Sequence, residues 1–259
     1  MLSIFNAIIL AQIGVGWLFI RYLILRDRGS KEPPKILAFA GVLGAVGFAA
    51  AWLLETWLLP ASFATNPHSL STSSLLGNSL LVGVIEEGCK SLPLAVFLFR
   101  KGYFNEVTDG IIYFGISGMV FGVMEDIGYA WSLGPSAGIA KLITGPYIHA
   151  GFCVLFGWAL ARRKVVRAPW LLVGGGLLAA ITMHGLYDFG LFYGHTWSLL
   201  LSLCITASVN AGIFVLYHFA ETTDARLGLS AVGNNYYCRA CGRPNPKRFL
   251  YCVYCGMRT

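Results

Sequence analysis

The chain has 259 residues, of which 56% are hydrophobic and only 12% are charged, about half the charged fraction of an ordinary soluble domain. This composition excludes a single soluble globular domain and indicates a protein that crosses a membrane several times. The net charge of +7 does not indicate nucleic-acid binding, because the basic residues gather in short segments between apolar runs, as in membrane proteins.

The first apolar segment begins almost at Met1 and has neither a basic n-region nor a small-residue cleavage site. We therefore expect a retained helix rather than a signal peptide. Six further segments have about the length that crosses a bilayer, so the predicted fold is all-α and polytopic, with about seven transmembrane helices. These cover residues 2–25, 36–59, 75–99, 110–132, 143–161, 169–191 and 196–219.

Basic residues alternate along the connectors. All but two of the 19 lie after the first, third, fifth or seventh segment or, in the case of Arg21, near the end of the first. The exceptions are Lys141, in the connector at 133–142, and Lys90, inside the third segment. The positive-inside rule therefore predicts an integral membrane protein with its N-terminus outside and its C-terminus in the cytoplasm.

Small residues and prolines predict how the helices meet. Glycines such as Gly44 and Gly118 repeat at three-residue spacing in the second and fourth segments, which favours close helix contact. We expect Pro93 and Pro146 to bend the third and fifth helices near their polar residues.

Glu86, Glu87 and Lys90 lie in the middle of the third apolar segment. Each costs roughly 2.5–3.5 kcal/mol at the centre of a lipid-facing helix. Such groups face a protein interior or a watery cavity and usually serve a function there. Further polar groups on later segments are Glu125, Asp126, His149, His184 and Asp188.

The depths of these groups agree. At a rise of ~1.5 Å per residue, Glu86 lies about 16 Å from the outer end of its helix, and Glu125 and His184 lie roughly 10 Å from theirs. A lone His149 would be an ordinary interior histidine, and Asp126 is equally well interpreted as a polar packing contact. Their joint occurrence in the outer half of the membrane instead predicts one functional site.

Spacing along the helices suggests partners within this set. Glu86 and Lys90 are four residues apart and can pair on one face, whereas Glu87 points about 100° away. His184 and Asp188 are also four apart, so the carboxylate can orient the imidazole or share a ligand with it. A purely structural ion pair is the alternative for Glu86 and Lys90.

The residue types define the chemistry. A shielded carboxylate can act as a general base on water, and two histidines can bind a divalent metal or stabilise an oxyanion. The set suits hydrolysis of a peptide bond inside the membrane. A proton-coupled transporter would use the same groups, and a non-enzymatic membrane scaffold would need none of them, so both remain alternatives.

Four motifs on successive segments form an ordered set: Glu86-Glu87-x-x-Lys90, Phe121-x-x-x-Glu125, His149 and His184-x-x-x-Asp188. The set resembles the PrsW family of intramembrane proteases, and more remotely the CAAX prenyl endopeptidase and Abi superfamily, over roughly residues 80–190. This resemblance implies an endopeptidase of a prokaryotic plasma membrane. Its substrates would be membrane-anchored proteins such as anti-sigma factors, cut on their outer side.

Under this resemblance Glu86 activates the water and Glu87 supports it. His149, His184 and Asp188 would form the oxyanion-binding or metal-binding side.

Glu125 stands where the prenyl endopeptidases have histidine, and Lys90 and Phe121 have supporting positions. The family is described both as metal-dependent and as glutamic, so a catalytic divalent metal stays open. The absence of a His-Glu-x-x-His motif favours the metal-free glutamate mechanism.

The C-terminal tail carries a separate motif. Cys238-x-x-Cys241 and Cys252-x-x-Cys255 are separated by ten residues, and a glycine follows each pair. Four thiolates at this spacing indicate a structural Zn²⁺ in a small zinc ribbon without an open catalytic position. Disulfides are the competing interpretation, which the predicted cytoplasmic location disfavours.

The predicted organisation is a membrane protease domain at 1–219, a linker at 220–235 and a zinc ribbon at 236–259. The expected partners are the lipid bilayer and a membrane-anchored protein substrate. The ribbon is expected to recruit a cytoplasmic protein or cap the chain rather than bind nucleic acid.

Overall fold

The computed structural model describes residues 2–229, 231–232, 235–237, 244–246, 251–252 and 255–258. Helices make up nearly all of this part. The seven long ones are α1 (Leu2–Arg26), α2 (Pro34–Leu58), α4 (Thr72–Leu98), α5 (Val107–Leu133), α6 (Pro135–Val166), α7 (Trp170–Tyr193) and α8 (Thr196–Arg226). The short α3 (Ala61–Thr65) and the 3₁₀ turn η1 (Pro67–Ser69) connect α2 to α4.

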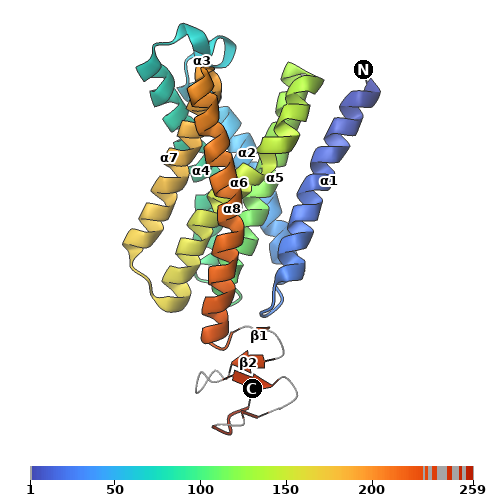
Figure 1. The fold of residues 1–259 in the computed structure, drawn as a ribbon, viewed down its shortest axis with the longest axis vertical. Coiled ribbons are helices and arrows are strands. Elements are labelled where there is room, and N and C mark those ends of the chain that lie inside the picture. Colours follow the sequence, from blue (N-terminus) through green and yellow to red (C-terminus); the bar gives the residue numbers. More distant parts are fainter. Residues whose placement is uncertain are drawn as a thin grey trace.

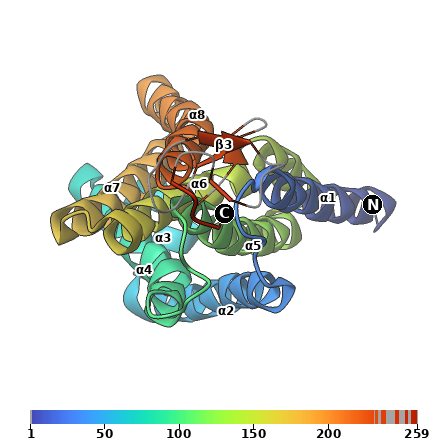
Figure 2. The same cartoon turned by 90° about the horizontal axis from the view of Figure 1, so that it is seen from below.

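The long helices run side by side along the long axis of the molecule (Figure 1). The N-terminus and the α2–α4 connection lie at one end, here named the outer end, and the C-terminal strands lie beyond the opposite, inner end. Seen from below, α5 and α6 lie in the middle of the bundle, with α1, α2, α4, α7 and α8 around them (Figure 2). The chain is therefore a single bundle with two central helices.

Five helices (α1, α2, α5, α7 and α8) are long and apolar enough to cross a membrane. A sixth span results if the two parts of α6, Pro135–Leu142 and Gly145–Val166, count as one crossing bent by 45°. The break between the two parts lies just before Pro146, near which the sequence predicts a bend. The 27-residue helix α4 carries three ionisable residues in its middle, which lowers its apolar character.

The close helix contacts that the glycines predict are confirmed. A Cβ atom at Gly44 of α2 would lie 2.3 Å from the Ser117 carbonyl oxygen of α5, and one at Gly118 would lie 2.5 Å from the His149 carbonyl oxygen of α6. Since backbone atoms cannot yield to a side chain, these glycines fix the distances between α2, α5 and α6. They thereby hold the polar segments of these helices together.

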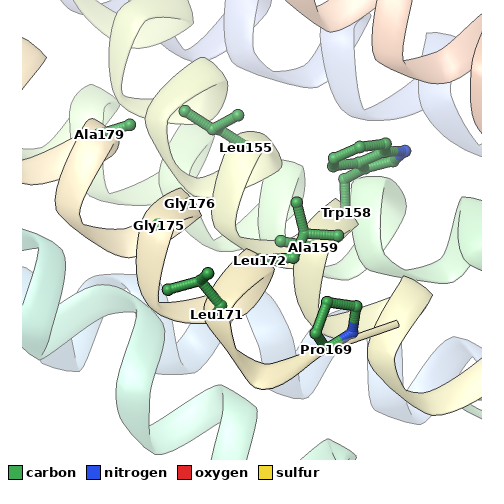
Figure 3. Close-up of a pocket in the computed structure, with 9 residues that line it drawn as sticks. All are labelled: Leu155, Trp158, Ala159, Pro169, Leu171, Leu172, Gly175, Gly176 and Ala179. Atoms are coloured by element: carbon green, nitrogen blue, oxygen red, sulfur yellow. The ribbon is translucent and has the colours of Figure 1, made fainter. Parts of the chain in front are cut away.

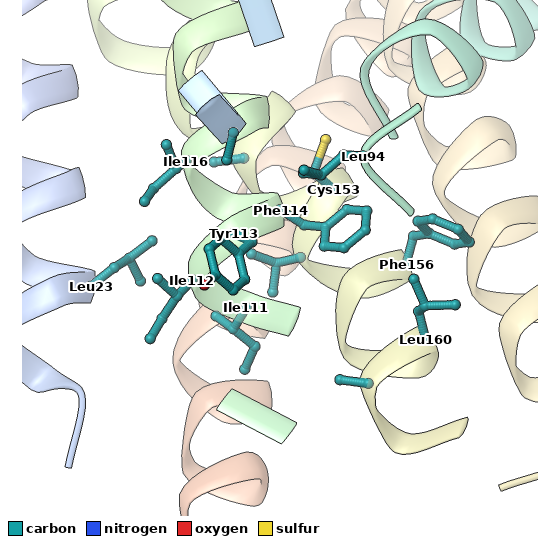
Figure 4. Close-up of a cluster of buried hydrophobic side chains, with 14 of the residues drawn as sticks. Leu23, Leu94, Ile111, Ile112, Tyr113, Phe114, Ile116, Cys153, Phe156 and Leu160 are labelled. Atoms are coloured by element: carbon teal, nitrogen blue, oxygen red, sulfur yellow. The ribbon is translucent and has the colours of Figure 1, made fainter. Parts of the chain in front are cut away.

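The inner half of the bundle is a conventional apolar core. Tyr113 and Phe114 of α5 pack with Phe156 of α6, Leu94 of α4 and Leu23 of α1 (Figure 4). All five side chains are at most 3% exposed. This core leaves the polar groups of the outer half on a rigid base.

The inner end is held by buried carboxylates. Asp224 of α8 accepts hydrogen bonds from the backbone N–H groups of Val107 and Thr108, at 2.7 and 2.9 Å, and so caps α5. In the loop between α1 and α2, Glu32 accepts a hydrogen bond from the Tyr113 hydroxyl. Burial raises the pKa of Glu32 to about 7, and burial also raises the pKa of the neighbouring Asp27.

The C-terminal part differs from the prediction at its start. Residues 220–226, expected in a linker, continue α8 to Arg226. Three short antiparallel strands follow: β1 (Ala231–Val232), β2 (Asn235–Tyr237) and β3 (Pro244–Pro246). Of the four predicted zinc ligands, Cys238 and Cys241 lie outside the described residues.

The second cysteine pair forms a tight turn. The Gly256 N–H donates to the Cys252 carbonyl oxygen at 2.9 Å, and the Cys252 N–H donates to Met257 at 2.7 Å. Gly256 has φ +72°, a left-handed conformation that glycine adopts readily. The glycine after Cys255 thus allows the chain to turn back over this pair.

Candidate active site

Helix α4 supplies the centre of the candidate site. Glu86 is 5% exposed, and Glu87 and Lys90 are fully buried. The Lys90 ammonium lies 2.8 Å from Glu87 Oε1 and 3.5 Å from Glu86 Oε2. The expected Glu86–Lys90 pair is present, but the closer partner of Lys90 is Glu87, because a residue three positions along the helix also lies on the same side.

His184 of α7 is held by Glu87. Its Nδ1 lies 2.8 Å from Glu87 Oε1 in a buried hydrogen bond. Its Nε2 lies 3.5 Å from both Glu86 Oε2 and Asp188 Oδ2. The spacing predicts that Asp188 orients this imidazole or shares a ligand with it. The structure gives the shorter contact to Glu87, which reaches the ring from a neighbouring helix.

His149 of α6 has a parallel arrangement. Its Nε2 lies 2.6 Å from Glu125 Oε2, so this carboxylate is the natural acceptor for a proton on that nitrogen. Its Nδ1 accepts a hydrogen bond from the Lys90 ammonium at 3.0 Å and lies 3.6 Å from Glu86 Oε2. The Phe121 ring packs 5.4 Å from the imidazole and 4.4 Å from the Lys90 ammonium, so Phe121 supports both groups.

The predicted position of Lys141 in a connector is wrong. Helix α6 begins at Pro135, so Lys141 lies within it and points into the bundle with only 15% of its side chain exposed. Its ammonium lies 3.6 Å from Glu125 Oε1 and 4.0 Å from Asp126 Oδ1. Glu125 therefore bridges Lys141 and His149, whereas Asp126 has no ion-pair contact with a histidine among the described residues.

The contacts of the two histidines converge on one oxygen atom. Glu86 Oε2 is buried and has no hydrogen-bond partner among the described residues. It lies 3.5 Å from His184 Nε2 and 3.6 Å from His149 Nδ1. Glu86, His149 and His184 each offer one ligand atom, and these three atoms lie within 4.8 Å of one another.

Two sides of this triangle, at 3.5 and 3.6 Å, have the length found in a metal site. In tetrahedral zinc sites, with bonds of about 2.0–2.2 Å, ligand atoms lie about 3.4 Å apart. Catalytic zinc is commonly held by two histidines and one glutamate, and such histidines usually turn their other nitrogen towards a carboxylate. Here Glu87 and Glu125 hold those positions on His184 and His149.

Glu55 of α2 is an ionisable residue that belongs to none of the motifs in the sequence. Its Oε1 atom is buried without a hydrogen-bond partner among the described residues, and it is close enough to Glu86, Glu125 and Asp188 to interact with them electrostatically. Ala51, one helical turn earlier, packs against Ile85 of α4. The signal in the sequence was a single acid in an otherwise apolar segment.

Carboxyl groups outnumber ammonium groups among the described residues of this region. Two ammonium groups, Lys90 and Lys141, face a larger set of carboxyl groups. These are Glu55, Glu86, Glu87, Glu125, Asp126 and Asp188. Buried carboxylates in excess require protons or a bound cation to balance them, which agrees with the dimensions of the Glu86–His149–His184 triangle.

The amino-acid sequence of this chain is similar to those of known proteins. The model of the PrsW family, described as intramembrane metalloproteases, matches residues 32–218. Protease PrsW of Clostridioides difficile (strain 630) is 28% identical over 204 residues, covering 75% of this chain and 81% of the relative. Protease PrsW of Bacillus subtilis (strain 168) is 25% identical over 195 residues, covering 74% and 85%. No solved structure matches the chain significantly.

Proposed function

We propose, because this chain belongs to the PrsW family of intramembrane proteases, that Glu86 activates a water molecule. The protein uses this water to cleave a peptide bond of a membrane protein. The chain is an integral membrane endopeptidase, and its substrates are membrane proteins. The observation that carries the role of Glu86 is the position of its Oε2 atom, which is buried, has no hydrogen-bond partner among the described residues and is faced by two histidines. The comparisons support this activity and not a proton-coupled transporter.

The side chains around Glu86 suggest how the reaction proceeds. The Glu86 carboxylate takes a proton from water as the hydroxyl adds to the carbonyl carbon of the substrate. When the C–N bond breaks, the same proton passes to the leaving amine. Lys90 and the two imidazoles, all within 3.6 Å of Glu86 Oε2, stabilise the negative charge that develops at this point.

The residues present also fit the metal ion that the family description names. Glu86, His149 and His184 would hold it, with Glu86 bound through one carboxylate oxygen while its other oxygen accepts the proton of the water. The Glu86 Oε2 atom, which has no hydrogen-bond partner among the described residues, and the carboxylates that contact both rings support this. A bound divalent ion would polarise the substrate carbonyl and make its water more acidic. The Lys90 ammonium, 3.0 Å from His149 Nδ1, would have to move towards Glu87 to release that nitrogen.

These contacts favour the metal-dependent mechanism over the metal-free one that the missing His-Glu-x-x-His motif suggests. The motif places both histidines on one helix, whereas here α6 and α7 supply one each. A motif within a single segment cannot reveal such a site.

We further propose that α4 completes seven crossings, with the outer end of the bundle outside the cell and the tail in the cytoplasm. The basic connectors support this orientation. The tail beyond α8 would form a structural zinc ribbon, which the turn at Cys252 and Gly256 supports. Anti-sigma-factor-like proteins with one membrane anchor are then suitable substrates, because Glu125 and His184 lie in the outer halves of α5 and α7.

The role of Glu86 is tested by Glu86→Gln, which keeps the shape of the side chain and removes the basic oxygen. We expect cleavage of a membrane-anchored reporter by the purified protein to fall by about 10²–10⁴-fold, the usual contribution of a general base. The matched control is Glu221→Gln, because Glu221 is also a buried glutamate but lies at the inner end, where it pairs with Arg26. A Glu86→Gln variant that retains full activity would refute the assignment.

A further inference from the structure

A cavity of about 510 Å³ lies between α6 and α7 (Figure 3), and none of the residues that line it belongs to the candidate site. Its walls are apolar and include Leu155, Trp158 and Ala159 of α6 and Leu171, Gly175 and Ala179 of α7. Leu171 is 84% exposed, so this side of the bundle faces the membrane. We refer to this cavity as the α6–α7 groove.

The length and depth of the α6–α7 groove match one leaflet of a bilayer. From Pro169, just before α7, to Ala179 the lining spans about 15 Å at ~1.5 Å per residue. The hydrocarbon core of a bilayer is about 30 Å thick. The groove therefore extends from the inner membrane surface to about the midplane, which is the depth that a single acyl chain reaches.

The inner end of the α6–α7 groove carries positive charge. The Arg162 guanidinium lies 5.1 Å from the Trp158 ring, and its Nε atom is buried without a hydrogen-bond partner among the described residues. The Arg163 guanidinium lies 5.0 Å from the Trp170 ring. No carboxylate of the described residues forms an ion pair with either arginine. Elsewhere at this end the Glu221 carboxylate pairs with both Arg26 and Arg28.

We propose that the α6–α7 groove binds one anionic phospholipid, with an acyl chain along the groove and the phosphate at Arg162 and Arg163. The apolar walls suit the chain, and a guanidinium binds phosphate oxygens with paired hydrogen bonds. Tryptophan side chains such as Trp158 and Trp170 are common at the depth of lipid headgroups. The charge of the arginines selects an anionic lipid over a zwitterionic one.

Headgroup recognition is tested by native mass spectrometry of the full-length protein in detergent. The protein is titrated with phosphatidylglycerol or with phosphatidylcholine of the same acyl chains. We expect one phosphatidylglycerol to bind with higher affinity than phosphatidylcholine, and Arg162→Gln to weaken it about fivefold, the usual effect of one basic residue near anionic lipid. The control is Arg21→Gln, since Arg21 also stacks on a tryptophan (Trp17, 5.2 Å) but lines no part of the groove.

The position of the acyl chain is tested by Gly175→Leu. A Cβ atom at Gly175 would have no neighbour within 4 Å, so a leucine there fills the groove without displacing protein atoms. We expect binding of phosphatidylglycerol to weaken at least fivefold. Gly174→Leu is the matched control, because position 174 is equally open but does not line the groove.

Two results would overturn the proposal. Equal affinity for the two lipids would show that the arginines do not select the headgroup. Equal binding by the Gly175→Leu and Gly174→Leu variants would show that the acyl chain lies elsewhere.

Discussion

At the scale of single residues, each histidine of the candidate site contacts a carboxylate from another helix. Glu87 contacts His184 at 2.8 Å, and Glu125 contacts His149 at 2.6 Å. These contacts determine which nitrogen of each ring carries its proton, and they leave the other nitrogen facing Glu86. The orientation of the imidazoles thus depends on neighbouring helices more than on their own.

The acidic pair on α5 allows a direct test of this arrangement. We expect Glu125→Gln to lower kcat/KM by about 10–100-fold, the typical effect of removing a carboxylate that orients a histidine at a metal site. Asp126→Asn, one position further along, should have a much smaller effect, because Asp126 contacts Lys141 and no histidine among the described residues. Steady-state cleavage assays of both variants make the comparison, and equal losses would contradict the role given to Glu125.

The gathering of these polar residues in one place could be predicted from the sequence, but several of their contacts could not. Ionisable groups in apolar segments are costly, which singled out Glu86, His149 and His184. Which carboxylate reaches which ring depends on helix rotation, so the Glu87–His184 contact could not be read from spacing. Glu55 was missed because it is alone in its segment and belongs to no motif.

At the scale of helices, the apolar segments correspond one to one with the seven long helices. The starts of α1 and α7 agree within a residue with prediction, whereas α6 begins eight residues earlier than the expected 143. Polar and small residues, including Gly138 and Lys141, made the first part of α6 resemble a connector. Tertiary contacts hold it as helix, since the Gln12 amide of α1 donates to the Gly138 carbonyl oxygen at 3.4 Å.

The loop between α1 and α2 gives a prediction about pH. In the unfolded chain Glu32 has an ordinary pKa of 4.5, and burial raises its pKa in the folded protein to about 7. Between pH 4.5 and pH 7, Glu32 binds more protons in the folded chain than in the unfolded chain. The stabilisation that this protonation gives the folded state is complete below pH 4.5 and is lost by about pH 7. Buried Asp27 and Glu106, whose pKa values are also raised by burial, act in the same direction.

We therefore expect the Tm of the purified protein to fall as the pH rises from 4.5 to 7, and Glu32→Gln to reduce this slope. The glutamine keeps a hydrogen-bond acceptor for Tyr113 and carries no charge at any pH. Thermal unfolding at several pH values measures the effect. A variant with the slope of the unmodified protein would show that Glu32 is already ionised in the folded state throughout this range.

At the scale of the whole molecule, orientation in the membrane is the proposal with the broadest consequences. If the N-terminus is outside and the tail is cytoplasmic, an added C-terminal epitope should resist protease in intact right-side-out vesicles and be cleaved after permeabilisation. An N-terminal epitope should be cleaved in both. The reverse pattern would place Glu86 near the cytoplasmic surface and exclude substrates cut on their outer side.

The central claim is that helices from across the bundle bring Glu86, His149 and His184 together as one metal-dependent hydrolytic centre. Metal content must be measured without interference from the tail, so the four tail cysteines are first replaced by serine in the full-length chain. We then compare this protein with the same protein carrying His149→Ala and His184→Ala.

The direct measurement is the number of divalent ions bound per chain, taken together with cleavage before and after chelation. We predict one ion per chain that the double histidine variant lacks, with activity lost on chelation and restored by adding the metal. Full cleavage by a chelated protein that holds no ion would contradict the metal-dependent mechanism and leave Glu86 acting alone.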